Sequence, residues 1–183
     1  NGYNKPADTY AAAGIAGYWN VLDSGLGNGT GILDSTGAMT GISLSCSRSL
    51  GATTTPNQTT EGDDAALLRD YLFSGYNDFD LTIFGVENDE YDILVYALGR
   101  QDYPYGTTVA INGDVGNQKF MTGIWSGSLL EGQTHTKHRV NITNNSVTLS
   151  LDKDGDAIIN GIQIIQIPEP ATLLLFSLGG LSL

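Results

Sequence analysis

Short apolar stretches of strand length, separated by polar turns, constrain the fold of this chain more than any other feature of its sequence. Both faces of the stretch 91–98 are apolar, so this segment should be a central strand that is covered on two sides. The turn at 87–90 joins it to the alternating stretch 80–86, which predicts a β-hairpin. The predicted strands are 40–47, 80–86, 91–98, 107–113, 137–142, 147–151 and 158–167.

One short helix is predicted in the body of the chain, over 65–73. Asp64 can cap its first turn, and Leu67, Leu68 and Tyr71 recur at helical spacing. Parallel strands would need crossover helices between them, and the sequence shows none. The pattern therefore predicts an all-β fold, an antiparallel sandwich with this helix as a plug at one end.

The composition limits the partners and the location of the protein. The chain has 183 residues with 24 glycines, 9 tyrosines and only 8 lysines and arginines, which is typical of a turn-rich extracellular domain. A formal net charge of −12 and a pI near 4.2 argue against nucleic acid or an anionic membrane as partner, and leave cations and neutral glycans open. The single cysteine, Cys46, cannot form an internal disulfide and should be a small buried strand residue.

The chain divides into three predicted parts. Residues 1–16 are poor in large apolar side chains and indicate an arm laid over a surface, 17–167 hold the β-sandwich domain, and 168–183 form an apolar tail. Trp19, before a glycine-rich loop, could be a glycan-stacking platform or a core residue. The apolar strand pattern around it favours the core.

The tail begins with Pro168, Glu169 and Pro170 and carries no charge from 171 to 183. The prolines should end the preceding strand, and an apolar helical segment is expected after them. Such a helix would be roughly 20 Å long, too short to span the ~30 Å hydrocarbon core of a bilayer alone. Burial of its six leucines and one phenylalanine would contribute on the order of 10 kcal/mol.

This Pro-Glu-Pro motif with its apolar segment resembles the PEP-CTERM sorting signal of exported bacterial proteins that are handled by an exosortase. The resemblance implies a bacterial protein, extracellular or at the cell surface, with an exosortase as partner during export. The body, in turn, is similar to the jelly-roll, galactose-binding-like β-sandwiches often joined to such tails, which implies that fold but no site. The segments that carry this second resemblance are Trp19-Asn20, Asp34-Ser35-Thr36-Gly37, 91–96 and 159–164.

Residues that could perform catalysis are few. His135 and His138 are the only histidines and could meet on a turn, but no cysteine or glutamate at ligand spacing joins them. No nucleophile elbow and no recognisable frame for paired catalytic carboxylates occurs in the sequence. We therefore expect a non-catalytic protein that requires no cofactor.

Asp152, Asp154 and Asp156, with Gly155 among them, form the most suggestive local cluster. Oxygen ligands at alternate positions could wrap a calcium ion, although the bidentate glutamate of a full calcium loop is missing. The alternative is a tight polar turn between two strands, for which Asp and Gly are preferred. The sequence leaves both interpretations open.

Two functions from different classes fit these features. The first is an extracellular structural protein, a non-catalytic subunit that assembles with copies of itself into a filament or matrix layer and buries its apolar tail between subunits. Its assembly residues would be Pro168, Pro170, Leu173, Leu174, Leu175, Phe176 and Leu178. The alternative is a carbohydrate-binding module of the extracellular polysaccharide matrix, with Tyr103, Tyr105 and Trp125 as stacking platforms.

Overall fold

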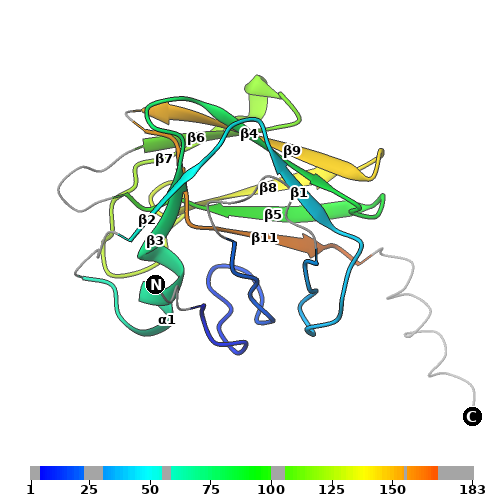
Figure 1. Ribbon diagram of the computed structural model, residues 1–183, viewed down its shortest axis with the longest axis horizontal. Coiled ribbons are helices and arrows are strands. Elements are labelled where there is room, and N and C mark those ends of the chain that lie inside the picture. Colours follow the sequence, from blue (N-terminus) through cyan, green and yellow to red (C-terminus); the bar gives the residue numbers. More distant parts are fainter. Residues whose placement is uncertain (1–4, 23–30, 55–58, 100–105, 155, 169–183) are drawn as a thin grey trace, which may run out of the picture.

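The computed structural model describes residues 5–22, 31–54, 59–99, 106–154 and 156–168, which form two facing layers of antiparallel strands (Figure 1). The first layer is a five-stranded sheet. Its strand order is β1 (Ser43–Cys46), β4 (Phe79–Phe84), β9 (Ser146–Asp154), β6 (Gly106–Ile111) and β7 (Lys119–Met121).

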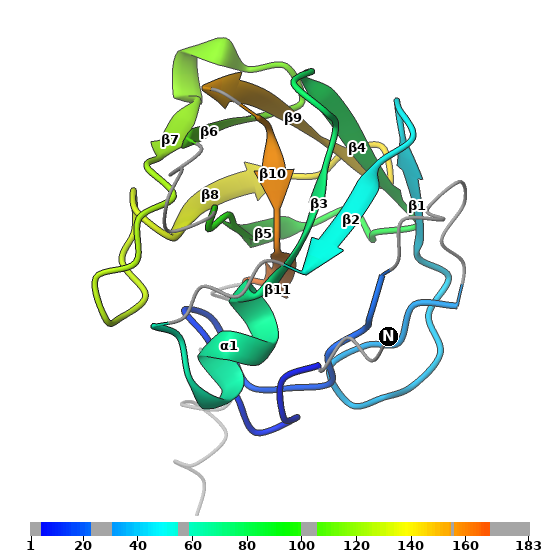
Figure 2. The same ribbon diagram turned by 60° about the vertical axis from the view of Figure 1, so that its left-hand side comes forward.

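Two three-stranded sheets complete the fold: the first forms the second layer, and the other runs between the two layers at one end of the sandwich (Figure 2). The first has the order β11 (Gly161–Gln166), β5 (Glu90–Tyr96), β8 (His135–Asn141), and the other β10 (Ile158–Ile159), β3 (Asp70–Phe73), β2 (Gly51–Thr54). Only Asn160 separates β10 from β11. Its Nδ2 donates to the carbonyl oxygens of Leu68 and Asp70 at 2.9 and 3.0 Å, and its Oδ1 accepts from the Leu98 N–H. These bonds hold the junction of the two sheets.

The predicted antiparallel jelly-roll sandwich with one short helix is confirmed. Its expected C-terminal helical segment falls on 169–183, outside the described residues. Within the part of the chain that the structure describes, no helix is long and apolar enough to cross a membrane.

The predicted hairpin of 80–86 with 91–98 is wrong. β4 pairs with β1 and β9 in the first layer, whereas β5 pairs with β11 and β8 in the second, so their connection crosses between the layers. Gly85 begins this crossing with a φ of +80°, and a Cβ there would lie 2.4 Å from the carbonyl oxygen of Gly41. Apolar alternation identifies a strand but not its partner. The central position predicted for β5 is confirmed.

The helix is shorter than predicted and begins earlier. Helix α1 covers Gly62–Leu68, with Glu61 at the N-cap and no side-chain capping bond, so Asp64 lies in the first turn rather than at the cap. There its carboxylate still faces the positive end of the helix dipole. The chain after Arg69 forms β3, which pairs with β2 and β10. The aromatic residues of this segment favour a strand, and the pairing overrides their helical spacing.

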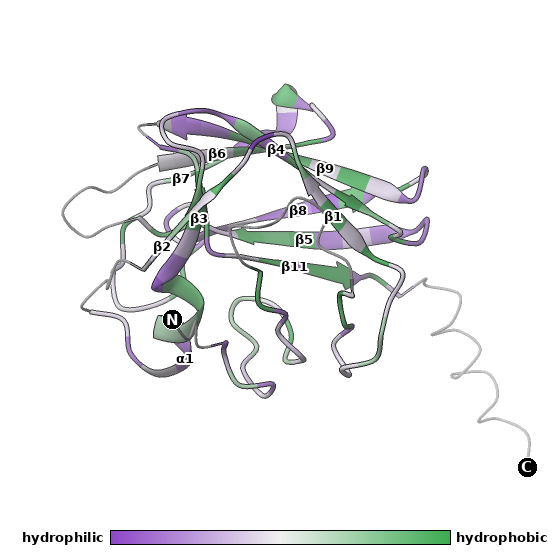
Figure 3. Cartoon of the chain, viewed as in Figure 1, coloured by the Kyte–Doolittle hydropathy of each residue, from purple (hydrophilic) through white to green (hydrophobic). Residues whose placement is uncertain are grey.

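Two apolar cores lie on opposite faces of β5. The first fills the space between the layers and contains Ile93 and Val95, both 0% exposed. The second covers the outer face of the second layer, where Leu94 and Tyr96 pack with α1 and with Trp19. Trp19 is buried, so its interpretation as a core residue is confirmed. Figure 3 shows β5 hydrophilic where it begins and hydrophobic in its later part, where the two cores meet it.

The N-terminal segment 5–16 is tied to this outer core through Tyr96 of β5. The Tyr96 hydroxyl accepts a hydrogen bond from the Ala13 N–H at 3.0 Å and donates to Gln163 Oε1 at 2.7 Å. Gln163 Nε2 in turn donates to the carbonyl oxygen of Ile15 at 2.8 Å. Burial raises the pKa of Tyr96 to about 12, so the hydroxyl keeps its proton.

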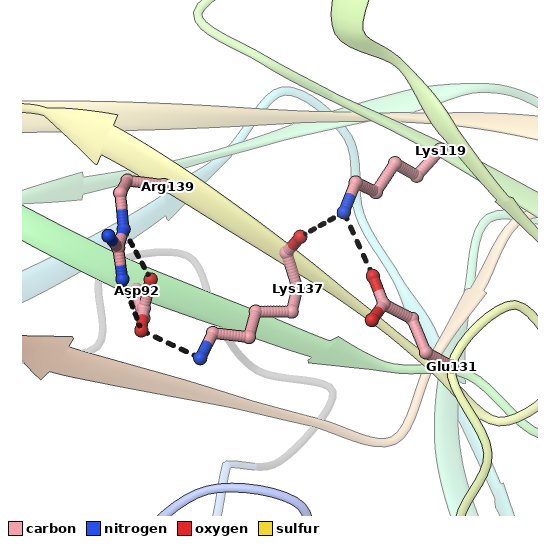
Figure 4. Close-up of polar contacts among 5 residues, drawn as sticks. All are labelled: Asp92, Lys119, Glu131, Lys137 and Arg139. Atoms are coloured by element: carbon pink, nitrogen blue, oxygen red, sulfur yellow. Dashed lines mark hydrogen bonds and ion pairs between the residues drawn. The ribbon is translucent and has the colours of Figure 1, made fainter.

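The two long edges of the sandwich differ (Figure 2). At one edge Lys119 of β7 forms an ion pair with Glu131 at 2.8 Å and donates to the carbonyl oxygen of Lys137 on β8 (Figure 4). Backbone bonds from Thr122 and Gly123 to 132–133 add to this closure. At the other edge β1 and β11 have no further strand partner among the described residues.

Removal of the Tyr96 hydroxyl tests whether it anchors the N-terminal segment. We expect Tyr96→Phe to lower the free energy of unfolding by about 1–3 kcal/mol, because the half-buried Ala13 N–H and the Gln163 amide lose a partner. Limited proteolysis should then cut faster within 5–16. Tyr91→Phe is the matched control, since Tyr91 is also buried in β5 and its hydroxyl bonds no described residue. Equal destabilisation by both variants would contradict this role of Tyr96.

Candidate functional site

The outer face of the first layer carries almost only short polar side chains. Along β9 the inward residues Val147, Leu149 and Leu151 are buried, and the residues between them face outward. Cross-strand pairing brings the outward residues of the five strands into rows. These rows are Ser43–Phe84–Ser146, Ser45–Thr82–Thr148, Asp80–Ser150–Ala110, and Asp152–Thr108–Phe120.

Short side chains leave this face hollow. A depression of about 670 Å³ lies over β4, β9 and β6, with Asp80, Ser150 and Asp152 in its lining. Val115 of the 3₁₀ turn η1 (Val115–Asn117) also lines it, and in Figure 1 this turn rises above the sheet. Val115 is 71% exposed, which leaves an apolar surface free beside the polar floor.

The polar groups of the depression offer both donors and acceptors. Arg48 lines it and is held by a bond from its Nε to the carbonyl oxygen of Asp78 at 3.0 Å. The carboxylates of Asp80 and Asp152 are exposed and accept no hydrogen bond from the other described residues. Within the same face the hydroxyls of Thr82 and Thr148 lie 3.0 Å apart and bond to each other. A ligand rich in hydroxyl groups could therefore find partners of both kinds here.

Two exposed aromatic rings stand at opposite corners of this face. Phe84 on β4 is 44% exposed and Phe120 on β7 is 45% exposed. Phe84 pairs with Ser146, whereas Phe120 lies in the row of Asp152, six residues further along β9 and three strands away from β4. These spacings place the two rings on the order of 25 Å apart. An exposed phenylalanine on a polar sheet face offers a flat apolar surface to a ring with C–H groups. We call this whole surface, from Phe84 to Phe120, the outer polar face.

Of the predicted glycan-binding aromatics, only Trp125 lies among the described residues. Tyr103 and Tyr105 lie outside the described residues. Trp125 is half-buried and packs against the outer core with Leu129, so much of its ring already has a protein partner. The structure thus leaves the Tyr103 and Tyr105 prediction untested and commits Trp125 largely to packing.

Two of the predicted calcium ligands, Asp152 and Asp156, differ in their exposure to solvent. Asp152 is exposed on the outer polar face, while Asp156 is buried and accepts the backbone N–H of Tyr76 at 3.0 Å. Asp154 ends β9, and its side chain is not among the described groups. Within the described residues no group of three His, Cys, Asp or Glu side chains could hold a metal ion. The calcium site stays a prediction.

His135 and His138 lie on strand β8 rather than on a turn, and they face opposite sides of it. His138 points into the sandwich core beside Ile93, with its Nε2 3.1 Å from the Thr136 hydroxyl. His135 packs against the Tyr96 ring in the outer layer, at 5.7 Å between centroids. Their side chains therefore cannot bind one metal ion together.

Sequence reasoning missed the outer polar face as a site. The available signal was alternation with buried residues. It is seen for Asp80, Thr82 and Phe84 in β4 and for Thr148 and Ser150 in β9. That signal shows only that these residues face water. The pairing of β4 with β9, and of β9 with β6, is what gathers them on one surface.

No protein-family model matches the chain, and none of the curated proteins matches it. Several solved structures resemble it weakly, among them the following three. The first is a family GH115 4-O-methyl-α-glucuronidase with specificity for decorated arabinogalactans, at 11% identity and a TM-score of 0.39, over 64% of this chain and 16% of the enzyme. The second is TmCBM61 in complex with β-1,4-galactotriose, at 9% identity and a TM-score of 0.35, over 69% of this chain and 88% of the module.

The third is an exo-β-1,3-galactanase from Phanerochaete chrysosporium with β-1,3-galactotriose, at 17% identity and a TM-score of 0.33, over 62% of this chain and 26% of the enzyme. The chain thus spans about a quarter or less of the two enzymes. These values are too low to assign a function.

The buried His138 should make stability depend on pH. Burial, and secondarily the charge of Lys119, lowers the pKa of His138 to about 4, whereas an unfolded histidine titrates near about 6.5. The unfolded chain therefore takes up the proton first, and stability should fall as the pH drops from about 6.5 toward about 4. His138→Gln should flatten this part of the profile, measured by urea denaturation. If the slope of stability against pH is the same in His138→Gln, burial of His138 does not cause this pH dependence, and the prediction is wrong.

Proposed function

We propose that this protein is a non-catalytic carbohydrate-binding module whose ligand lies along the outer polar face. The observation that carries the proposal is the hollow on that face, with exposed carboxylates and hydroxyls on its floor and an exposed phenylalanine at each end. Sugars present hydroxyls that both donate and accept hydrogen bonds, and C–H faces that pack on aromatic rings.

The charge of the protein selects the class of glycan. With a net charge of −12, and with Asp80 and Asp152 on the floor of the site, an anionic polysaccharide would be repelled. A neutral polysaccharide carries no such penalty. Its hydroxyls would donate to the two carboxylates, and Arg48 at the rim would donate to its oxygens.

The length of the outer polar face favours a polymer over a monosaccharide. A separation on the order of 25 Å between Phe84 and Phe120 lets one chain contact both rings and the hollow between them. Contacts spread over this length are individually weak, so affinity would come from their sum. Because binding alone is proposed, the bound polysaccharide should keep its chain length, as measured by the absence of new reducing ends.

Substitution of the two phenylalanines tests this site directly. We expect Phe84→Ala and Phe120→Ala each to weaken binding about tenfold, because each removes one stacking surface worth about 1 kcal/mol or more. Affinity electrophoresis on a panel of neutral polysaccharides, including β-1,4- and β-1,3-galactans, gives the readout. Met39→Ala is the control, since Met39 is 72% exposed but lies on the segment below β1 and away from the outer polar face.

A parallel double variant separates this face from the loop predicted by the sequence. Tyr103→Ala with Tyr105→Ala should leave retention unchanged if the outer polar face holds the glycan. Loss of retention in that variant, with no effect of Phe84→Ala or Phe120→Ala, would contradict the outer polar face and place the ligand at the 100–105 loop.

Export and surface location remain part of the proposal. The Pro-Glu-Pro motif and the apolar residues after it support sorting by an exosortase in a bacterium, and a carbohydrate-binding module would act in the extracellular matrix. The alternative, a self-assembling filament or matrix subunit, is supported by one specific feature, the apolar edge between β1 and β11.

A further inference from the structure

A largely apolar cavity of about 870 Å³ opens between the edge strands β1 and β11, and its lining also includes the charged residues Lys5, Asp34, Asp70 and Glu87. Leu44 of β1 and Ile83 of β4 line it from the first layer, and Ile162 and Ile164 of β11 line it from the second. We call this cavity the edge slot. At the opposite edge, by contrast, the ion pair of Lys119 and the backbone bonds around 122–133 join the two layers.

The edge slot is too large to be an ordinary packing defect. Protein interiors have few voids larger than one water molecule, and this volume would hold on the order of 30 waters at about 30 Å³ each. Water in such a space would face isoleucine and leucine side chains. Ile162 and Ile164 are indeed only half-buried, although they belong to the inward face of β11.

Further apolar side chains are exposed at the mouth of the edge slot. Ile15 is 49% exposed and Val21 is 51% exposed, and both contribute to its lining. Together with the half-buried residues inside, they form an apolar surface that continues from the solvent into the sandwich. A surface of this kind is typical of a binding site for an apolar segment of protein.

We propose that the edge slot binds the apolar segment 171–183 of a second copy of this chain. That segment has thirteen uncharged residues, six of them leucine and one phenylalanine, and only residues 167–170 separate it from β11, which forms one wall of the slot. Fully extended it reaches at most about 45 Å, enough to enter a neighbour. The edge strands β1 and β11 also offer unpaired backbone groups to an added segment.

The partner is a second copy rather than the same chain because of the residues that link the segment to β11. Pro168 and Pro170 restrict their own φ and keep the residues before them extended, which disfavours an immediate reversal into the adjoining slot. An extended exit carries the segment outward. Repetition of this contact joins copies head to tail into an open polymer.

Disulfide cross-linking of the full-length chain tests this proposal. Cys46, half-buried in β1, is first replaced by serine so that no native thiol competes. One preparation then carries Leu178→Cys in the apolar segment, and a second carries Val21→Cys at the mouth of the slot. Mixed and oxidised with glutathione disulfide, they should give a product of twice the 19.4 kDa mass of one chain. Phe176→Glu in the first preparation should abolish this product.

Two controls identify the occupant. The first control is Val115→Cys. Val115 is 71% exposed but lies on η1 at the outer polar face, so this variant should give no mixed product with the Leu178→Cys chain. Equal yields from Val21→Cys and Val115→Cys, or no product from either, would overturn the proposal. A chain with both Leu178→Cys and Val21→Cys that closes its disulfide internally and stays monomeric would also overturn it, because its own segment would then occupy the slot.

Discussion

Burial of both faces of β5 is the constraint on which the rest of this structure depends. Ile93 and Val95 face the first layer, while Leu94 and Tyr96 face away from it, and all four are almost completely buried. A sandwich of two sheets covers only one face of each sheet. The second face is covered by α1, by Trp19 and by the N-terminal segment that Tyr96 anchors. Irregular segments thus act as a third layer.

This third layer explains why so many polar atoms near β5 are paired. At the junction of β10 and β11, the Asn160 side chain donates two hydrogen bonds and accepts one. Gln163 links Tyr96 to the carbonyl oxygen of Ile15. On the exposed end of the same face Asp92 pairs with Lys137 at 2.7 Å and with Arg139 at 3.1 Å (Figure 4). The adjacent Arg139 guanidinium holds the pKa of Asp92 below its usual range. The described polar groups around β5 are therefore largely used for structure.

The first layer has the opposite character, because among the described residues only the η1 turn rises over its outer face. Its Ser, Thr and Asp side chains meet water between Phe84 and Phe120, and this is where a neutral polysaccharide is proposed to bind. The edge slot, in contrast, is apolar and lies between the layers. The two surfaces share no lining residue, so a module could hold a glycan while its neighbours hold one another. A matrix protein with both contacts would link polysaccharide to a protein polymer.

The sequence by itself determined the class of fold and the central place of β5, because alternation and two-sided apolarity are local properties of a strand. Net charge likewise limited the partners without any structure. Only the tertiary structure decided that β4 pairs with β9 rather than with β5, and that 71–73 form a strand rather than the end of a helix. Pairing is a long-range choice that one strand's pattern does not record. For the same reason Asp152 was noticed from the sequence as part of a local cluster, whereas Phe84 and Phe120, thirty-six residues apart, became one surface only when the sheet assembled.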